Sequence, residues 1–135
     1  MHKQRVIWSN GCFDILHRGH IELFKYAKSL GDYLVVGIDT DQRVANSKGP
    51  SRPVNCLIDR VAVLEAIRYI DKVTWFATDE ELSFNISKFK ANAIVVGNDY
   101  VDRNVIGSHL VDEIIFFEKL NEYSTTKILQ HPINR

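Results

Sequence analysis

The chain has 135 residues, of which 45% are hydrophobic and 25% are charged, and Lys+Arg and Asp+Glu each number 17. These values predict one globular domain over residues 1–135. The zero net charge lacks the basic footprint of a nucleic-acid-binding protein. No apolar run is long enough to cross a membrane, and the first residues lack a signal-peptide core. The 2 cysteines make no disulfide framework, which favours a cytoplasmic protein.

Strands and helices alternate through the first part of the chain. A short apolar run at 5–9, stopped by Asn10-Gly11, predicts a buried strand. From Gly19 the apolar residues follow helical spacing, and Gly31-Asp32 ends that helix. A continuous apolar run at 33–38 then predicts a second strand, covered on both faces.

The rest of the chain continues this alternation after a polar segment. That segment, 41–55, holds one Gly, two Pro and two Ser, so it predicts a loop over most of its length. The elements expected after it are a helix at 57–70, a strand at 72–76, a helix from 78 to about 90, a strand at 93–97, a polar loop at 98–104, a strand at 113–118 and a short helix at 124–130.

This order predicts an α/β fold, namely a single-domain, Rossmann-like, five-stranded parallel sheet with helices on both faces. In such sheets ligands bind beyond the carboxyl ends of the strands, near the point where the strand order reverses. That rule selects the loops at 10–19, 39–55, 97–104 and 119–126. Most of the unusual polar residues lie there, so we expect the functional site at that end of the sheet.

Two histidines, His17 and His20, flank Gly19 at the predicted turn between the first strand and the first helix. As zinc ligands they would need a third ligand at recognisable spacing, and neither C-x-x-C nor H-E-x-x-H is present. A helix N-terminus attracts anions, glycine permits close approach, and imidazolium groups would add charge and donors. A phosphate site is therefore favoured, and metal ligation and burial in the core remain the alternatives.

Two motifs carry a family resemblance. "GCFDILHRGH", Gly11–His20, contains the sequence H-x-G-H, and "YSTTKIL", Tyr123–Leu129, places S-T-T at the start of the last predicted helix. With both motifs in this order, the whole chain resembles the cytidylyltransferase-like nucleotidyltransferases. The resemblance implies transfer of a nucleotidyl group from an NTP, ATP or CTP accompanied by Mg²⁺, to a phosphorylated sugar or polyol, with release of pyrophosphate.

The resemblance also implies a catalytic set. His17 and His20 would hold the triphosphate and stabilise charge on the α-phosphate during in-line attack. The nucleophile would be an ionised phosphate oxygen of the acceptor, which needs no general base. Lys48, on a Gly/Pro loop, would be a mobile clamp, with a solvated lysine as the alternative. The hydroxyl and backbone N–H groups of Ser124 and Thr125, at the start of the last predicted helix, would complete the set, with an ordinary N-cap as the alternative.

Binding residues follow from the same resemblance. The implied nucleotide site consists of Gly11, Cys12, Phe13, Asp14, Gly19, Asp99, Ser124, Thr125 and Thr126. The implied substrate site consists of Asp41, Lys48, Arg52, Arg60, Arg68 and Lys119. Asp14 would be linked to Mg²⁺ or to the hydrogen bonds of the site, with the capping of a turn as the alternative. Asp99, as a nucleotide-side acid, also has a turn residue as its alternative. Arg60 has a helix-surface ion pair as its alternative, and Arg68 would meet either a ligand phosphate or a carboxylate of another subunit.

Two subgroups of the family compete for the substrate. "KGPSRPVN" looks like the heptose-1-phosphate adenylyltransferase domain, which makes ADP-heptose for lipopolysaccharide, whereas "LGDYLVVGI", Arg68 and "STTKI" look like glycerol-3-phosphate cytidylyltransferase. The first match is the more distinctive. Moreover, Lys119 and Glu122 replace an arginine and a glycine of the glycerol-3-phosphate enzymes, and lysine lacks the bidentate fork. We therefore expect ADP-sugar synthesis for the cell envelope, with CDP-glycerol synthesis as the alternative.

Three other functions stay open: an FAD synthetase-type adenylyltransferase, a non-catalytic nucleotide-binding protein, and a hydrolase or metal enzyme using the histidine pair. A homodimer is expected from the family resemblance and from Arg68, Trp75 and Phe76.

Overall fold

A computed structural model describes residues 4–97 and 104–118 of the chain. Within these residues one sheet has the strand order β3-β2-β1-β4-β5, and all neighbouring strands are parallel. The strands are β1 (Val6–Gly11), β2 (Tyr33–Asp39), β3 (Lys72–Phe76), β4 (Ala93–Gly97) and β5 (Glu113–Phe117). The helices are α1 (Arg18–Ser29), α2 (Asp41–Lys48), α3 (Leu57–Glu65), α4 (Asp79–Lys88) and the 3₁₀ helix η2 (Ser108–Leu110).

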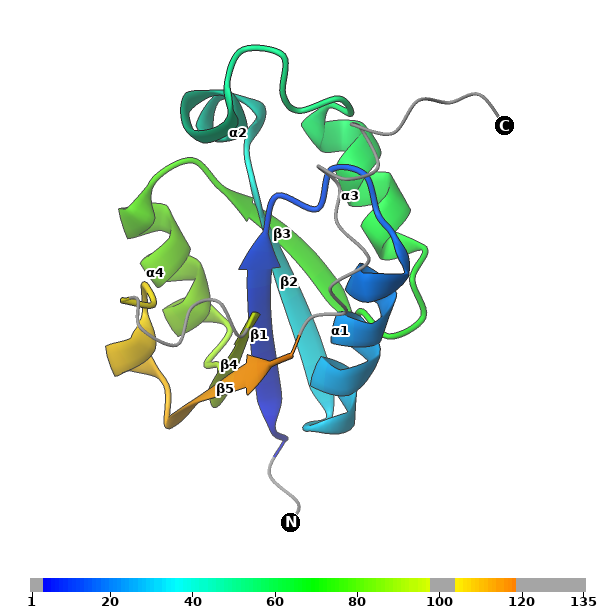
Figure 1. The fold of residues 1–135 in the computed structure, drawn as a ribbon. Coiled ribbons are helices and arrows are strands. Elements are labelled where there is room, and N and C mark those ends of the chain that lie inside the picture. Colours follow the sequence, from blue (N-terminus) through cyan, green and yellow to red (C-terminus); the bar gives the residue numbers. More distant parts are fainter. Residues whose placement is uncertain (1–3, 98–103, 119–135) are drawn as a thin grey trace.

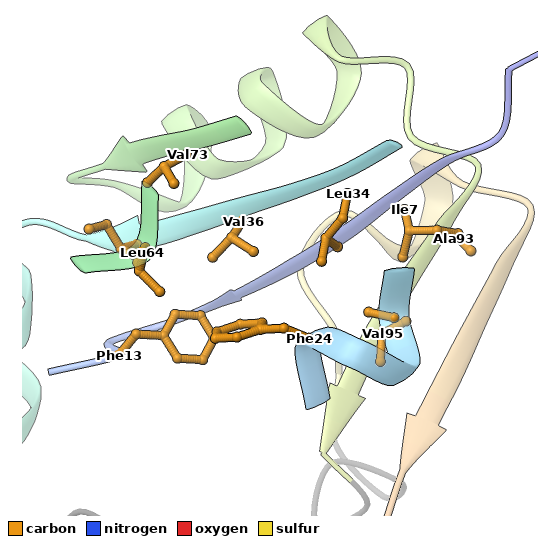
Figure 2. Close-up of a cluster of buried hydrophobic side chains, with 11 residues drawn as sticks. Ile7, Phe13, Phe24, Leu34, Val36, Leu64, Val73, Ala93 and Val95 are labelled. Atoms are coloured by element: carbon orange, nitrogen blue, oxygen red, sulfur yellow. The ribbon is translucent and has the colours of Figure 1, made fainter. Parts of the chain in front are cut away.

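Helices cover both faces of this sheet, which confirms the predicted α/β fold (Figure 1). On one face, α1 and α3 bring Phe24 and Leu64 onto the strands, and Figure 2 shows both side chains in a cluster that also contains Phe13. On the other face, α4 packs Leu82 and Ile86 in a second cluster. The apolar faces found by periodicity are therefore the faces that are buried.

The strand order reverses between β1 and β4, and these two strands separate toward their carboxyl ends. The ladder pairs only Ile7 with Ala93 and Trp8 with Ile94, although both strands continue further. Beyond this point the buried hydroxyl of Ser9 donates to the carbonyl of Val95 at 3.0 Å. A crevice at such a switch point is where open α/β sheets bind ligands.

The segment 41–55 departs from the predicted loop because its first half is helix α2. This helix is polar, and Val44 is its one buried residue, so its apolar periodicity is too weak to detect. Two ion pairs attach it to the sheet and to α4: the Arg43 guanidinium contacts the carboxylates of Asp39 and Asp79, both at 2.8 Å. Tertiary contacts therefore stabilise a helix that the hydrophobic pattern misses.

Other boundaries differ by a few residues. The helix predicted at 57–70 ends at Glu65, and residues 66–70 form turns before β3. The strand predicted at 5–9 is Val6–Gly11, and η2 was not predicted. The last predicted helix, at 124–130, and most of the loop at 98–104 lie outside the described residues. In the part that is described, no helix combines the length and apolarity needed to cross a membrane.

Candidate active site

The turn after β1 has a strained backbone that is stabilised by the core. Phe13 adopts φ 47°, in the left-handed region that side chains other than glycine rarely occupy. Its ring is buried and lies edge-on to the rings of Phe24, at 5.0 Å, and His20, at 5.5 Å. Strain of this kind costs about 1–3 kcal/mol and persists where the surrounding packing enforces it. The core thus sets the direction in which the chain enters α1.

His17 and His20 cap the N-terminus of α1. His17 is the N-cap residue, and its Nδ1 accepts a hydrogen bond from the backbone N–H of Gly19 at 3.0 Å. In return, Nδ1 of His20 accepts from the backbone N–H of His17 at 3.2 Å. The two rings lie 3.9 Å apart, tilted by 30°. This is a capping box in which two imidazoles replace the usual Ser or Thr and Glu or Gln.

The capping bonds determine which ring nitrogens donate. Both Nδ1 atoms accept an N–H, so neither carries a proton, and the proton of each neutral ring is on Nε2. Two Nε2–H donors at a helix N-terminus are well suited to developing negative charge on a phosphate oxygen.

Asp14 joins this turn to the segment that follows α2. Its side chain is 1% exposed, and its two carboxylate oxygens accept the backbone N–H groups of Val54 at 2.6 Å and Asn55 at 2.8 Å. The Asn55 side chain also donates to the Asp14 carbonyl at 3.3 Å. Asp14 therefore caps a distant loop rather than its own turn.

Arg60 is buried at the carboxyl ends of β1 and β2. Its Nε donates to the Asn55 carbonyl at 3.0 Å, and its Nη1 donates to the carbonyls of Cys12 at 3.0 Å and Asp39 at 2.8 Å. Its Nη2 contacts the Asp41 carboxylate at 2.7 Å. We call Arg60 and these four acceptors the Arg60 cluster. Arg60 is thus in neither of its expected environments, a ligand phosphate or an exposed helix-surface ion pair.

Lys48 ends α2 close to the same turn. Burial raises the pKa of the Cys12 thiol, and the positive charges of Lys48 and Arg60 offset part of that rise. The Lys48 side chain is exposed, and Gly49 follows it with φ 104°. The Lys48 ammonium group is therefore close enough to the turn after β1 to act electrostatically on Cys12, and the Cys12 thiol stays protonated at neutral pH.

Asp41 and Arg52, two predicted substrate-binding residues, line one cavity of about 370 Å³. The other lining residues are Gln42, Ala45, Pro50, Pro53, Val54 and Cys56. The Arg52 Nε atom is buried, lies 3.6 Å from the Asp14 carboxylate and makes no hydrogen bond within the described residues. The Asp14 carboxylate therefore offsets part of the charge of this guanidinium group.

Several predicted residues are not brought to this site. Arg68 lies beyond α3, before the amino end of β3 and therefore at the opposite end of the sheet, where it is exposed and donates to the Tyr69 hydroxyl at 2.9 Å. The helix that was to bury it has already ended at Glu65. The remaining predicted residues lie outside the described part of the chain: Asp99, Lys119, Ser124, Thr125 and Thr126.

Three residues of the site escaped sequence reasoning. Asp39 and Asn55 act through backbone carbonyls in the Arg60 cluster, which no side-chain pattern signals. Thr40, the N-cap of α2, has a buried hydroxyl with no hydrogen-bond partner among the described residues. Its position directly after a predicted strand was the available signal.

Comparisons with known proteins show which family the chain resembles. A family model described as cytidylyltransferase-like matches residues 8–131. The bifunctional protein HldE of Campylobacter concisus is 41% identical over 128 residues, which are 95% of this chain and 27% of that protein. HldE of Marinomonas sp. is 42% identical over 135 residues, with 96% and 28% covered. The chain thus spans 27% to 28% of the length of these relatives.

Solved structures share the fold. A lipopolysaccharide core biosynthesis protein from Thermoplasma volcanium has a TM-score of 0.73 at 24% identity, covering 87% of this chain and 99% of that one. Pantothenate synthetase from Thermus thermophilus has a TM-score of 0.60 at 13% identity, covering 92% and 63%. At these identities the likeness concerns the fold alone.

The histidine cap makes a prediction about stability. His17→Ala is expected to lower the free energy of unfolding by about 1 kcal/mol, whereas His17→Asn is expected to keep it, because asparagine is a strong N-cap residue. Urea unfolding followed by circular dichroism measures both, with the exposed Arg18→Ala as the control. Unchanged stability of His17→Ala would show that the imidazole does not stabilise the helix as its cap.

Proposed function

Since the chain belongs to the cytidylyltransferase-like family, we propose that it transfers a nucleotidyl group from an NTP to a phosphorylated sugar, with release of pyrophosphate. The observation that carries this proposal is the histidine pair that caps α1 and keeps its Nε2–H groups as donors.

In the proposed reaction an ionised phosphate oxygen of the acceptor attacks the α-phosphorus of the NTP. The new P–O bond forms as the bond from the α-phosphorus to the bridging oxygen breaks, and pyrophosphate leaves with that oxygen. The Nε2–H groups of His17 and His20 stabilise the charge that builds on the α-phosphate and bridging oxygens. Lys48 supplies a mobile positive charge that holds the phosphates. Positioning and charge stabilisation suffice, as in other phosphoryl transfers.

Mg²⁺ is expected to arrive with the NTP. Mg²⁺ is usually bound through one or two carboxylates and the substrate's own phosphates, and its charge offsets that of the triphosphate. Asp14 does not fit a direct ligand, since it is buried and both carboxylate oxygens accept backbone N–H groups. We therefore assign Asp14 to organising the turn after β1 and not to holding the ion.

The acceptor is best placed in the cavity beside Asp41 and Arg52. The Asp41 carboxylate is half exposed and suits sugar hydroxyls, and the Arg52 guanidinium suits a phosphate. Four of the eight residues that line this cavity, Pro50, Arg52, Pro53 and Val54, belong to Lys48–Asn55, the stretch that resembles heptose-1-phosphate adenylyltransferases. Together with the HldE relatives, this favours ADP-heptose synthesis for the cell envelope over CDP-glycerol synthesis. As one cytoplasmic nucleotidyltransferase domain, the chain would correspond to one part of those relatives.

A pyrophosphate-release screen tests this function. ATP, CTP, GTP and UTP are each combined with heptose 1-phosphate, glycerol 3-phosphate and FMN. Turnover is expected with ATP and heptose 1-phosphate. Turnover only with CTP and glycerol 3-phosphate would instead select the alternative substrate pair, and no turnover with any pair would contradict the proposed reaction.

The histidine variants separate catalysis from folding. His17→Asn is expected to keep the helix cap but to lose about 10²–10³-fold in kcat, because its shorter side chain has no donor at the Nε2 position. His17→Ala and His20→Ala are expected to lose at least as much. Steady-state kinetics on folded protein measures this loss, and Arg18→Ala is the matched control. Near-normal kcat in His17→Asn would contradict the assigned role.

A homodimer through the edge strand β3 is also proposed. An open apolar cavity of about 280 Å³ is lined by Leu57, Ile58, Val61, Ala62, Glu65 and Trp75. Ile58 is 78% exposed and Trp75 is 52% exposed. Phe76, however, is 1% exposed and belongs to the core, so its predicted part in the interface is wrong.

This surface predicts the oligomeric state. The chain is expected to sediment as a dimer at micromolar concentration, and Ile58→Glu is expected to give a monomer, because it places a charge in an apolar contact. Phe84→Glu, a similar change at an exposed apolar residue of α4, is the control and should stay dimeric. A monomeric wild-type protein would contradict the proposal.

A further inference from the structure

We infer that Arg60 is a positioning residue. It fixes the turn that carries His17 and His20, the nucleotide side of the site, relative to the cavity proposed for the acceptor, the acceptor side. This inference rests on the proposed function, since it concerns the relative placement of the two substrates. In the described contacts Arg60 does not touch the histidines, and it meets the cavity lining only through the Asp41 carboxylate. Its other contacts are to the backbone of the segments that carry the site.

The acceptors of the Arg60 cluster come from three separate segments. Cys12 belongs to the turn that leads to His17 and His20. Asp39 and Asp41 lie at the junction of β2 and α2, the helix that ends in Lys48. Asn55 ends the stretch that supplies four of the eight residues lining the cavity. Each segment supplies a different part of the proposed active site.

The planar guanidinium makes these contacts directional. Arginine has five N–H donors in a rigid fork, and four of them are accounted for by the described acceptors. The Arg60 side chain is 0% exposed, so water does not replace an acceptor that moves away. Displacing any one segment would leave a buried charged donor unpaired, which is costly. The three segments are therefore constrained to move together.

A second clamp acts on the same residue. The backbone N–H of Asn55 donates to Asp14, while the carbonyl of Asn55 accepts from Arg60. Asp14 belongs to the turn after β1. Cys12, whose carbonyl accepts from Arg60, belongs to the same turn. The acceptor-side stretch is thus attached to the nucleotide-side turn through two bridges, one anionic and one cationic.

The contacts of Arg60 favour a role in positioning over a role in general stability. All four acceptors lie at the carboxyl end of the sheet, where the proposed substrates bind. Leu64, one helical turn further along α3, is also fully buried, but it packs in the apolar cluster beneath α1 and makes none of these contacts. Leu64 therefore provides a matched variant that loosens the same helix without releasing the segments.

The test compares Arg60→Lys with Leu64→Ala on the full chain. Lysine keeps the charge but cannot reach acceptors in several directions, so kcat is expected to fall about 10- to 100-fold, as for a misplacement of about 1 Å. Amide hydrogen exchange should become faster at residues 12–17 and 52–56 but not in α4. Leu64→Ala, assayed at the same folded fraction, should keep kcat within about twofold, because the Arg60 contacts remain.

The outcomes separate this inference from the proposed function. Unchanged kcat and unchanged exchange in Arg60→Lys would overturn the inference while leaving the function intact. An inactive wild-type protein would overturn the function, and hydrogen exchange would still test whether Arg60 couples the segments. If Arg60→Lys does not fold, Asp41→Ala replaces it as the test variant. No hydrogen bond or ion pair described here joins Asp41 to residues 12–17, so faster exchange at those residues supports coupling through Arg60. Unchanged exchange at those residues overturns the inference.

Discussion

The guanidinium group of Arg60 lies where three segments of the chain converge. Because the group is buried, a shift of any one segment would leave a charged donor without a hydrogen-bond partner. A charge removed from water is stable only while its hydrogen-bond partners remain in place. Three of the four partners are carbonyls, and the one carboxylate, that of Asp41, is half exposed. The Arg60 guanidinium therefore restricts movement of the three segments that form the site.

The turn after β1 combines strain, packing and polar capping within eight residues. Phe13 accepts an unfavourable backbone conformation, and its ring anchors the turn in the core beside His20. The imidazoles then satisfy two N–H groups of the new helix through Nδ1. Since one nitrogen of each ring is engaged in the fold, only the other is suited to a substrate. The fold thereby selects the tautomer on which the proposed chemistry depends.

Much of the fold was predictable because its signals are local. Continuous apolar runs marked β1 and β2, and the reversal of strand order pointed to the loops that carry the site. Helix α2 was missed because ion pairs of Arg43, rather than an apolar stripe, attach it. The environment of Arg60 was missed because its partners are backbone carbonyls up to 48 residues away in the chain. Arg68 was misplaced because its predicted helix was one turn too long.

The histidine cap bears on how the H-x-G-H signature should be interpreted across sequences. These side chains cap a helix and, under the proposed function, also bind a substrate, so selection for folding alone would preserve a capping side chain at both positions in a descendant that had lost its reaction. Lys48 is different, since it is exposed and, among the described residues, holds no hydrogen bond or ion pair. Under the proposed function, selection on Lys48 would therefore act through catalysis and not through folding.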